Sequence, residues 1–268
     1  MSEKTILNRE ISQKGHSNNL NKSLIIYELR NIEGNPVIHI FGVLLPIFLS
    51  VIISKAGTAD IPENMKSETI TSIVIGMSLL IPMATVLIGH AAVYAQEMEK
   101  GIPQRMSLFG FQERTLFMAK VIAEFINMTM AFIIYAIVEY LLLDIQKPAV
   151  GSVFCLVICL YLTAVIMYAL STAIVNFVRK FGPSYAISMT LYFLFMMLCG
   201  MMGVKTEQLP QVLKFFSKLM PMSYISNDFG GFWTGGNYNF VPMIQAFLFL
   251  GAVSGIILYL SVYRNKRG

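Results

Sequence analysis

The chain has 268 residues, of which 56% are hydrophobic and only 13% are charged. A water-soluble domain of this length could not bury so much apolar surface, so the composition excludes a soluble globular protein and indicates a membrane protein. The net charge is +5. Contact with anionic lipid headgroups explains this charge, and no nucleic-acid partner is needed.

Six segments are apolar over about 20 residues, the length that crosses a bilayer as a helix. They are helices because lipid cannot satisfy an open backbone. Pro46 and Pro82 fall inside the first and second segments and predict kinks there. The fold class expected is an all-α polytopic membrane protein with six transmembrane helices. The predicted spans are 37–54, 73–93, 119–143, 150–178, 185–204 and 241–262.

Lysine and arginine are unevenly distributed between the spans. Most of them fall before the first span, between spans two and three, between spans four and five, and after the sixth. The positive-inside rule places these segments, and therefore both termini, in the cytoplasm. We expect a multi-pass protein of a bacterial cell membrane. Its expected parts are a disordered cytoplasmic tail (1–19), an interfacial helix (20–36), the six-span domain (37–262) and a cytoplasmic tail (263–268).

The segment before the first span has apolar residues at helical spacing. Leu24, Ile25 and Ile32 recur on one side, with Arg30 among the polar residues. This pattern predicts an amphipathic helix that lies along the inner membrane surface and leads into the first span. The alternative is a plain juxtamembrane linker.

The connection between spans two and three carries charges of both signs around a Gly-Ile-Pro step. Pro103 suits the first turn of a short helix in which Ile102, Met106 and Phe109 share a face, and Gly101 and Gly110 supply turns at its two ends. Such a compact helix can fit a groove in another protein. The alternative is an interfacial hairpin with no partner.

An amphipathic outer segment is expected between spans five and six. Val212, Leu213 and Phe216 share its apolar face, so it should lie in the outer leaflet. Trp233 and Tyr238 follow it, and we expect these aromatic side chains at the membrane interface.

Catalytic and nucleotide-binding motifs are missing from the sequence. It contains no GxxxxGK[ST], HExxH or GxSxG pattern, so neither ATP hydrolysis by the P-loop route nor a hydrolase is predicted. No metal site is expected, because Cys155 and Cys159 share a helix face without His or acid at ligand spacing and are assigned to packing. We therefore expect no cofactor in this chain.

Ionisable residues inside the spans are few. Glu124 follows Lys120 by four residues, and a contact within the helix explains it. Glu139 is expected close enough to the outer end for water to reach it. His39 and His90 could face each other, although contact with headgroups is the favoured interpretation.

Two further patterns concern the later spans. Met196, Met197 and Met201 crowd the fifth span, where packing explains them most simply and a translocation path for an amphipathic substrate is the alternative. Gly251 and Gly255 form a GxxxG step in the sixth span, which lets two helices approach closely.

The order of these elements resembles the ABC-2 type permeases of ATP-binding cassette exporters. In that family the second-to-third connection holds acidic residues, a glycine, a short helix, a turn and a lysine. The outer stretch 219–233 is similar to the family's Leu-Pro-x-Ser/Thr-Tyr stretch. Ala95 and Gln96 stand where the family often has an arginine, and Gly110 stands where it often has a proline. The residues at the family's positions in the connection are Glu97, Glu99, Gly101, Arg105, Met106, Gly110 and Lys120.

This resemblance implies that the chain forms half of a translocation path for a drug, peptide, lipid or glycan. A separate cytoplasmic ATP-binding cassette subunit would bind ATP and Mg²⁺. It would push on the connection from Gly101 to Gly110 and on the amphipathic helix from Leu20 to Ile32. A second permease copy, identical or related, would complete the path. Two alternatives from other classes remain: a membrane scaffold or receptor that does not transport, and an ion-driven carrier.

Overall fold

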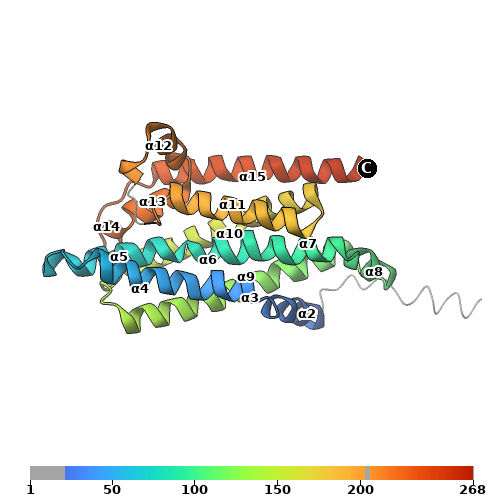
Figure 1. The fold of residues 1–268 in the computed structure, drawn as a ribbon, viewed down its shortest axis with the longest axis horizontal. Helices are drawn as coiled ribbons and strands as arrows, with labels where there is room; N and C mark the ends of the chain where they lie inside the picture. Colours follow the sequence, from blue (N-terminus) through green and yellow to red (C-terminus); the bar gives the residue numbers. More distant parts are fainter. Residues whose placement is uncertain (1–21, 203–205, 268) are drawn as a thin grey trace, which may run out of the picture.

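The computed structural model describes residues 22–202 and 206–267, and these are almost entirely helical (Figure 1). Six helical stretches are long and apolar enough to cross a membrane, as the sequence predicted. Their ends differ from the predicted ones by a few residues at most sites, and the second extends well beyond both predicted ends. The six are Pro36–Gly57, Glu63–Glu99, Arg114–Leu142, Val150–Val178, Phe181–Leu198 and Val241–Arg264. The predicted tail 1–19 and Leu20 lie outside the described residues.

The chain enters the first span through α2 (Lys22–Glu33). Leu24 and Ile32 are buried while Arg30 is exposed, which confirms the predicted amphipathic face. Asn35 then caps α3 (Pro36–His39) by accepting a hydrogen bond from Val37 N. The span continues through the π-helical segment η1 (Ile40–Leu44) and α4 (Leu45–Gly57).

The second span is the centre of the bundle. It consists of α5 (Glu63–Ser78), α6 (Leu80–Pro82), the π-helical segment η2 (Met83–His90) and α7 (Ala91–Glu99). Its apolar window is 89% buried, against 28% in the first, third and sixth spans. This span is therefore surrounded by protein, and the others cover it.

Both prolines for which kinks were predicted lie close to a change of hydrogen-bond pattern. The π-helical segment η1 ends at Leu44, two residues before Pro46, and η2 begins directly after Pro82. A proline has no N–H to donate, and a wider turn accommodates the missing bond. Two glycines bring the first two spans together, because a Cβ atom on Gly42 would lie 2.6 Å from Thr85 Cγ2 and one on Gly89 would lie 2.9 Å from Ile38 Cγ1.

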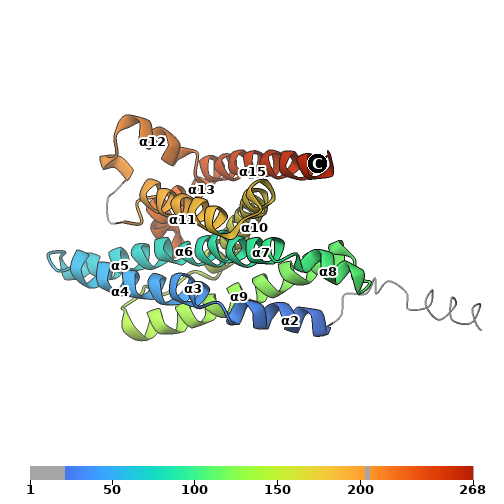
Figure 2. The same ribbon diagram turned by 45° about the vertical axis from the view of Figure 1, so that its right-hand side comes forward.

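The remaining spans follow a short helix. After α7 the chain forms α8 (Ile102–Leu108), then α9 (Glu113–Leu142), α10 (Val150–Val178) and α11 (Phe181–Leu198). The last span, α15 (Val241–Arg267), packs mainly along α10. In two views, α2, α8 and the carboxyl terminus lie at the same end of the molecule (Figures 1 and 2). We call this the α8 end.

The opposite end holds the connection between α11 and α15. It comprises η3 (Thr206–Gln208), α12 (Gln211–Lys218), α13 (Pro221–Asp228) and α14 (Gly230–Trp233). Val212 and Phe216 of α12 are exposed, as expected of a segment that lies in lipid. The expectation for Trp233 was wrong: its ring is buried, and its Nε1 donates to Gln146 O at 2.9 Å, because α13 and α14 turn back into the bundle.

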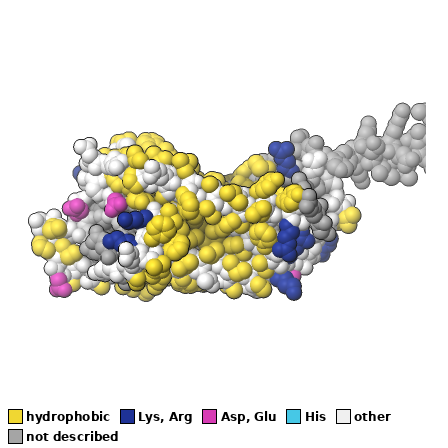
Figure 3. Space-filling view, turned by 90° about the horizontal axis from the view of Figure 1, so that it is seen from above, with side chains coloured by type: hydrophobic (Ala, Val, Ile, Leu, Met, Phe, Trp, Pro, Cys, Tyr) yellow, Lys and Arg dark blue, Asp and Glu magenta, His cyan; other side chains and the backbone are white. Residues whose placement is uncertain are grey.

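The surface agrees with a bilayer setting. Apolar side chains cover most of the middle of the face seen from above, and Lys and Arg gather at the α8 end (Figure 3). Side chains of both charge signs appear toward the opposite end. The molecule therefore presents an apolar middle and two polar ends, the arrangement required of a protein that spans a membrane.

Candidate functional site

The short connecting helix α8 is a defined element at one end of the molecule. It begins after Gly101, which has φ 65°, and ends before Gly110, which has φ 87°. Both values lie in the left-handed region that favours glycine. Arg105 stabilises the entry, since its Nη2 donates to Lys100 O at 2.5 Å. The predicted short helix with a glycine turn at each end is confirmed.

Two sides of α8 face different surroundings. Ile102 and Met106 are partly buried and line a cavity. Phe109 was expected on the same face, and this was wrong: Phe109 is 79% exposed and Leu108 is 86% exposed. Two large apolar side chains are therefore exposed next to each other at a polar end of the protein.

Glu99 connects the entry of α8 to another span. Its exposed carboxylate accepts a hydrogen bond from the backbone N–H of Phe181, at 2.9 Å. Phe181 is the first residue of α11. A carboxylate is favoured at a helix amino terminus, where the backbone N–H groups have no helical partners.

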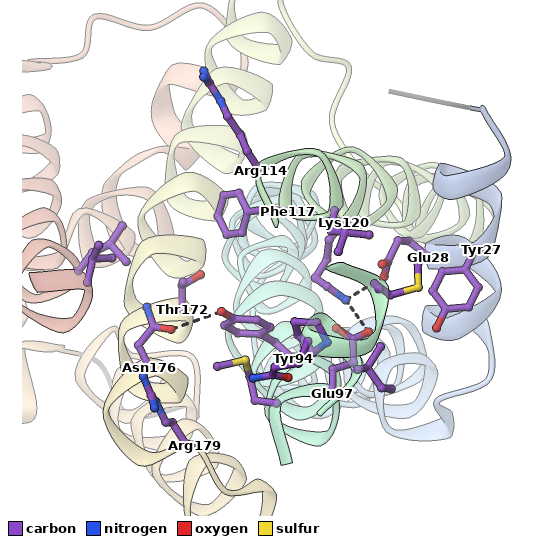
Figure 4. Close-up of a pocket in the computed structure, with 18 residues that line it drawn as sticks. Tyr27, Glu28, Tyr94, Glu97, Arg114, Phe117, Lys120, Thr172, Asn176 and Arg179 are labelled. Carbon is purple, nitrogen blue, oxygen red and sulfur yellow. Dashed lines mark hydrogen bonds and ion pairs between the residues drawn. The ribbon is translucent and has the colours of Figure 1, made fainter. Parts of the chain in front are cut away.

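Lys120, near the start of α9, lies inside the protein between two carboxylates. Its Nζ is 2.8 Å from Glu28 Oε2 and 2.8 Å from Glu97 Oε1. Asn31 Nδ2 also donates to Glu97 Oε1, at 2.8 Å. The side chains of the three charged residues are at most 9% exposed. This cluster ties α2, α7 and α9 together, and Figure 4 shows Lys120 between the two acids.

The environment of this cluster alters the acidity of Glu28. Burial raises the pKa of the Glu28 carboxyl, and the nearby Lys120 partly offsets that effect. Two acids share one base, so a single lysine faces both carboxyl groups. Removal of the lysine would therefore leave two acids without a cation in a buried site.

A second polar cluster lies deeper along the same helices. His90 Nδ1 is 2.7 Å from Glu124 Oε1, and His90 Nε2 is 3.0 Å from Thr172 Oγ1. The expected pairing of Glu124 with Lys120 was wrong, because Lys120 points to Glu28 and Glu97. His90 is only 1% exposed. It therefore contacts neither headgroups nor His39, whose Nε2 lies 3.0 Å from Glu33 O.

A chain of hydrogen bonds extends the polar region to the last span. Tyr94 Oη donates to Asn176 Oδ1 at 3.4 Å, and Asn176 Nδ2 donates to Ser261 Oγ at 3.3 Å. The rings of His90 and Tyr94 stack with centroids 5.3 Å apart. Polar contacts therefore reach from the α8 end through α7 and α10 to α15.

A cavity of about 590 Å³ lies among these elements. Residues from α2, α7, α8, α9, α10 and α15 line it, and Figure 4 shows Tyr94 and Asn176 joined across it. Glu28, Glu97 and Lys120 are part of its wall. Movement of α8 would change the shape of this cavity directly, since Ile102 and Met106 line it.

The residues predicted for the path and for helix packing lie elsewhere. Met196 and Met201 are almost fully buried in the main core and Met197 is partly buried, and none of the three lines this cavity. A Cβ atom on Gly251 would meet Ile166 at an ordinary 3.8 Å, and Gly255 has open space around it. Close packing within this chain thus requires neither glycine.

Sequence reasoning missed the Glu28–Lys120–Glu97 cluster and the His90–Glu124 pair. One signal was available for Glu28, which follows Leu24 and precedes Ile32 by four residues and so falls on the apolar face of α2. For His90 and Glu124 the signal was their depth in the spans, where ionisable groups are costly. Which groups pair could not be read from a single sequence.

These features define a class: a helical multi-pass membrane protein that carries, at one polar end, a short helix with exposed apolar side chains. The ABC-2 type transporter family model matches residues 19–229, and the chain belongs to that family. The chain is thus a non-enzymatic membrane subunit, and its family implies an ATP-binding partner subunit. A search of curated proteins found no match.

Proposed function

We propose that this chain is the permease subunit of an ABC exporter and that α8 is the helix through which a separate ATP-binding subunit drives it. The observation that carries the proposal is the exposure of Leu108 and Phe109 on a helix held between two left-handed glycines. A partner groove could hold these side chains, and rigid turns would transmit its movement. ATP and Mg²⁺ would bind to the partner and not to this chain.

The buried polar clusters supply a route for that movement. Glu99 links the entry of α8 to α11, and Lys120 links α7 to α2 and α9. The buried Glu97 acts in this scheme through Lys120 and Asn31, while Arg105 and Met106 keep α8 in place against the turn and the cavity. A displacement of α8 would therefore move several spans together.

The proposed orientation and assembly follow from charge and family. The α8 end, where Lys and Arg gather, would face the cytoplasm of a bacterial cell. A second copy of this chain or a related one would complete the translocation path. The apolar walls of the bundle favour an amphipathic or hydrophobic substrate, such as a drug, a lipid, a peptide or a lipid-linked glycan.

Co-purification with the ATP-binding subunit and export from cells test this proposal together. The variant Leu108→Ser/Phe109→Ser should insert normally and lose the ATP-binding subunit, because the contact surface is gone. Glu99→Arg should keep the complex but hydrolyse ATP without export, because a positive charge faces the amino terminus of α11. Met65→Ser is the matched control, since Met65 is 52% exposed on α5, toward the opposite end.

A scaffold or receptor that does not transport is the second candidate, and the exposed side chains of α8 alone would also suit it. The two candidates differ in the Glu99→Arg variant. A scaffold needs α8 only for attachment, so this variant would leave its activity unchanged. Wild-type export by both variants would count against a coupling role for α8.

A further inference from the structure

A second cavity lies toward the end opposite α8, between α5, α9 and α10. Its volume is about 360 Å³, within the range of sites that hold small organic molecules. Aromatic rings form much of its wall, among them Phe132, Tyr135, Tyr161 and Trp233. None of the polar residues proposed for coupling lines this cavity.

One carboxylate stands in this apolar wall. Glu139 is completely buried, and it is the one charged residue among those described as lining the cavity. Its Oε2 accepts a hydrogen bond from Ser50 Oγ at 3.0 Å. Its Oε1 has no hydrogen-bond partner among the described residues. The expectation that water reaches Glu139 was therefore wrong.

Within the described part of the chain, the buried oxygen Oε1 of Glu139 lacks a hydrogen-bond partner, which is energetically unfavourable. A carboxylate inside a membrane is costly, and a half-satisfied one more so. A donor or a cation that enters the cavity would satisfy Oε1, as a water molecule would. A small metal ion fits poorly, since hard cations take several oxygen ligands and Glu139 is the single acid in the wall.

The cavity opens on the apolar side of the bundle. Ile133 and Tyr140 of α9 and Val157 of α10 line it, and these side chains are 55%, 50% and 43% exposed. All three lie on membrane-spanning helices. A ligand would therefore arrive through the bilayer, which admits molecules with a large apolar part.

We propose that this cavity binds a lipophilic organic cation with a single positive charge. The charge lies beside Glu139 Oε1, and the apolar body fills the space among Phe132, Tyr161 and Trp233. Aromatic faces attract cations as well as apolar groups, so the wall and the acid favour the same ligand. A neutral molecule of the same shape gains only the apolar contacts, and an anion meets the carboxylate.

This inference stands on the cavity and is independent of the proposed export. Binding is measurable on the purified chain without ATP or a partner subunit. A chain that binds the cation but exports no substrate would contradict the proposed function alone. A chain that exports another substrate and does not bind the cation would contradict the present inference alone.

Radiolabelled N-butylpyridinium is a suitable probe, because butylbenzene has the same shape without the charge. The protein is placed in nanodiscs of uncharged lipid, and binding to empty nanodiscs is subtracted. We expect saturable binding that unlabelled N-butylpyridinium displaces at least tenfold more effectively than butylbenzene does. Trp233 is the single tryptophan of the chain, so quenching of its fluorescence by the probe locates the bound cation.

Glu139→Gln keeps the shape of the side chain and removes its charge. We expect this variant to bind the cation at least tenfold more weakly. Glu68→Gln is the matched control: Glu68 is exposed on α5, does not line the cavity, and should leave binding within twofold of the native chain. Equal displacement by butylbenzene, unchanged binding by Glu139→Gln, or no saturable binding would overturn the proposal. If Glu139→Gln does not fold, the comparison of N-butylpyridinium with butylbenzene on the native chain still tests the proposal.

Discussion

Lys120 joins three helices through two carboxylates, and its loss should be costly. Replacement of one partner in a buried ion pair leaves the other charge without compensation, which typically destabilises a protein by about 3–5 kcal/mol. Lys120→Met would leave both Glu28 and Glu97 in that state. We expect a clear fall in the temperature at which the detergent-solubilised protein loses its monodisperse peak in size-exclusion chromatography.

Two further variants separate this cause from a general effect of removing a lysine. Lys100→Met changes an exposed residue two positions after the partly buried Met98, and it should leave thermal stability unchanged. The triple variant Glu28→Gln/Glu97→Gln/Lys120→Met removes all three charges. Because no unpaired charge remains, it should recover most of the lost stability. A triple variant as unstable as Lys120→Met would show that packing of the lysine stem, and not charge, holds the cluster.

The helix α8 depends on backbone conformation at its entry. A residue with a Cβ atom in the left-handed region costs about 1–2 kcal/mol, and asparagine tolerates that region better than most. A Cβ atom on Gly101 would meet nothing closer than Gln104 Oε1 at 3.7 Å, so space is not the limit there. Gly101→Ala should weaken export per ATP hydrolysed several-fold, while Gly101→Asn should retain more of it.

Gly182→Ala provides the control for that comparison. Gly182 lies in α11 with open space around it and no left-handed backbone angle, so alanine should be neutral or slightly stabilising. Transport by reconstituted vesicles, divided by their rate of ATP hydrolysis, measures the coupling. Equal ratios for Gly101→Ala, Gly101→Asn and the native chain would contradict a mechanical role for this turn.

At the scale of elements, the sequence predicted those features that a local pattern encodes. Apolar spacing predicted α2, and glycine and proline predicted α8 and the interruptions at Pro46 and Pro82. The return of α13 and α14 into the bundle was not predicted. Their sequence mixes Ser, Asn and Gly with apolar residues. The burial of Met222 and Ile225 depends on α15 and on α5, and α5 lies far away in the chain.

Contacts between distant parts of the chain also explain why parts of the candidate sites were predicted incorrectly. Residues four apart on one helix suggested that Glu124 pairs with Lys120, but partners from other helices take both. Glu139 looked close to water because it lies three residues before the end of α9. Ser50, on another span, and the cavity wall determine its real surroundings. Which side chains pair between spans depends on the tertiary structure. Hydropathy predicts where the helices are but not which helices lie next to each other.

At the scale of the molecule, the arrangement of ends is open to a direct test with single cysteines. Of the three native cysteines, Cys155 and Cys159 lie within the fourth span and Cys199 directly follows the fifth. Cys159 and Cys199 are buried, and Cys155 is partly buried. A membrane-impermeant maleimide should therefore label the native chain little. Ser107 on α8 and Thr234 after α14 are exposed and lie toward opposite ends of the bundle.

Ser107→Cys should react in inside-out vesicles and stay unlabelled in intact cells, because the positive-inside rule places the α8 end in the cytoplasm. Thr234→Cys should show the reverse. The native chain serves as the blank in both preparations. Addition of the ATP-binding subunit should then protect Ser107→Cys while leaving Thr234→Cys reactive, since the proposed contact covers α8 alone. Labelling of Ser107→Cys from outside the cell would invert the orientation and remove α8 from the reach of any cytoplasmic partner.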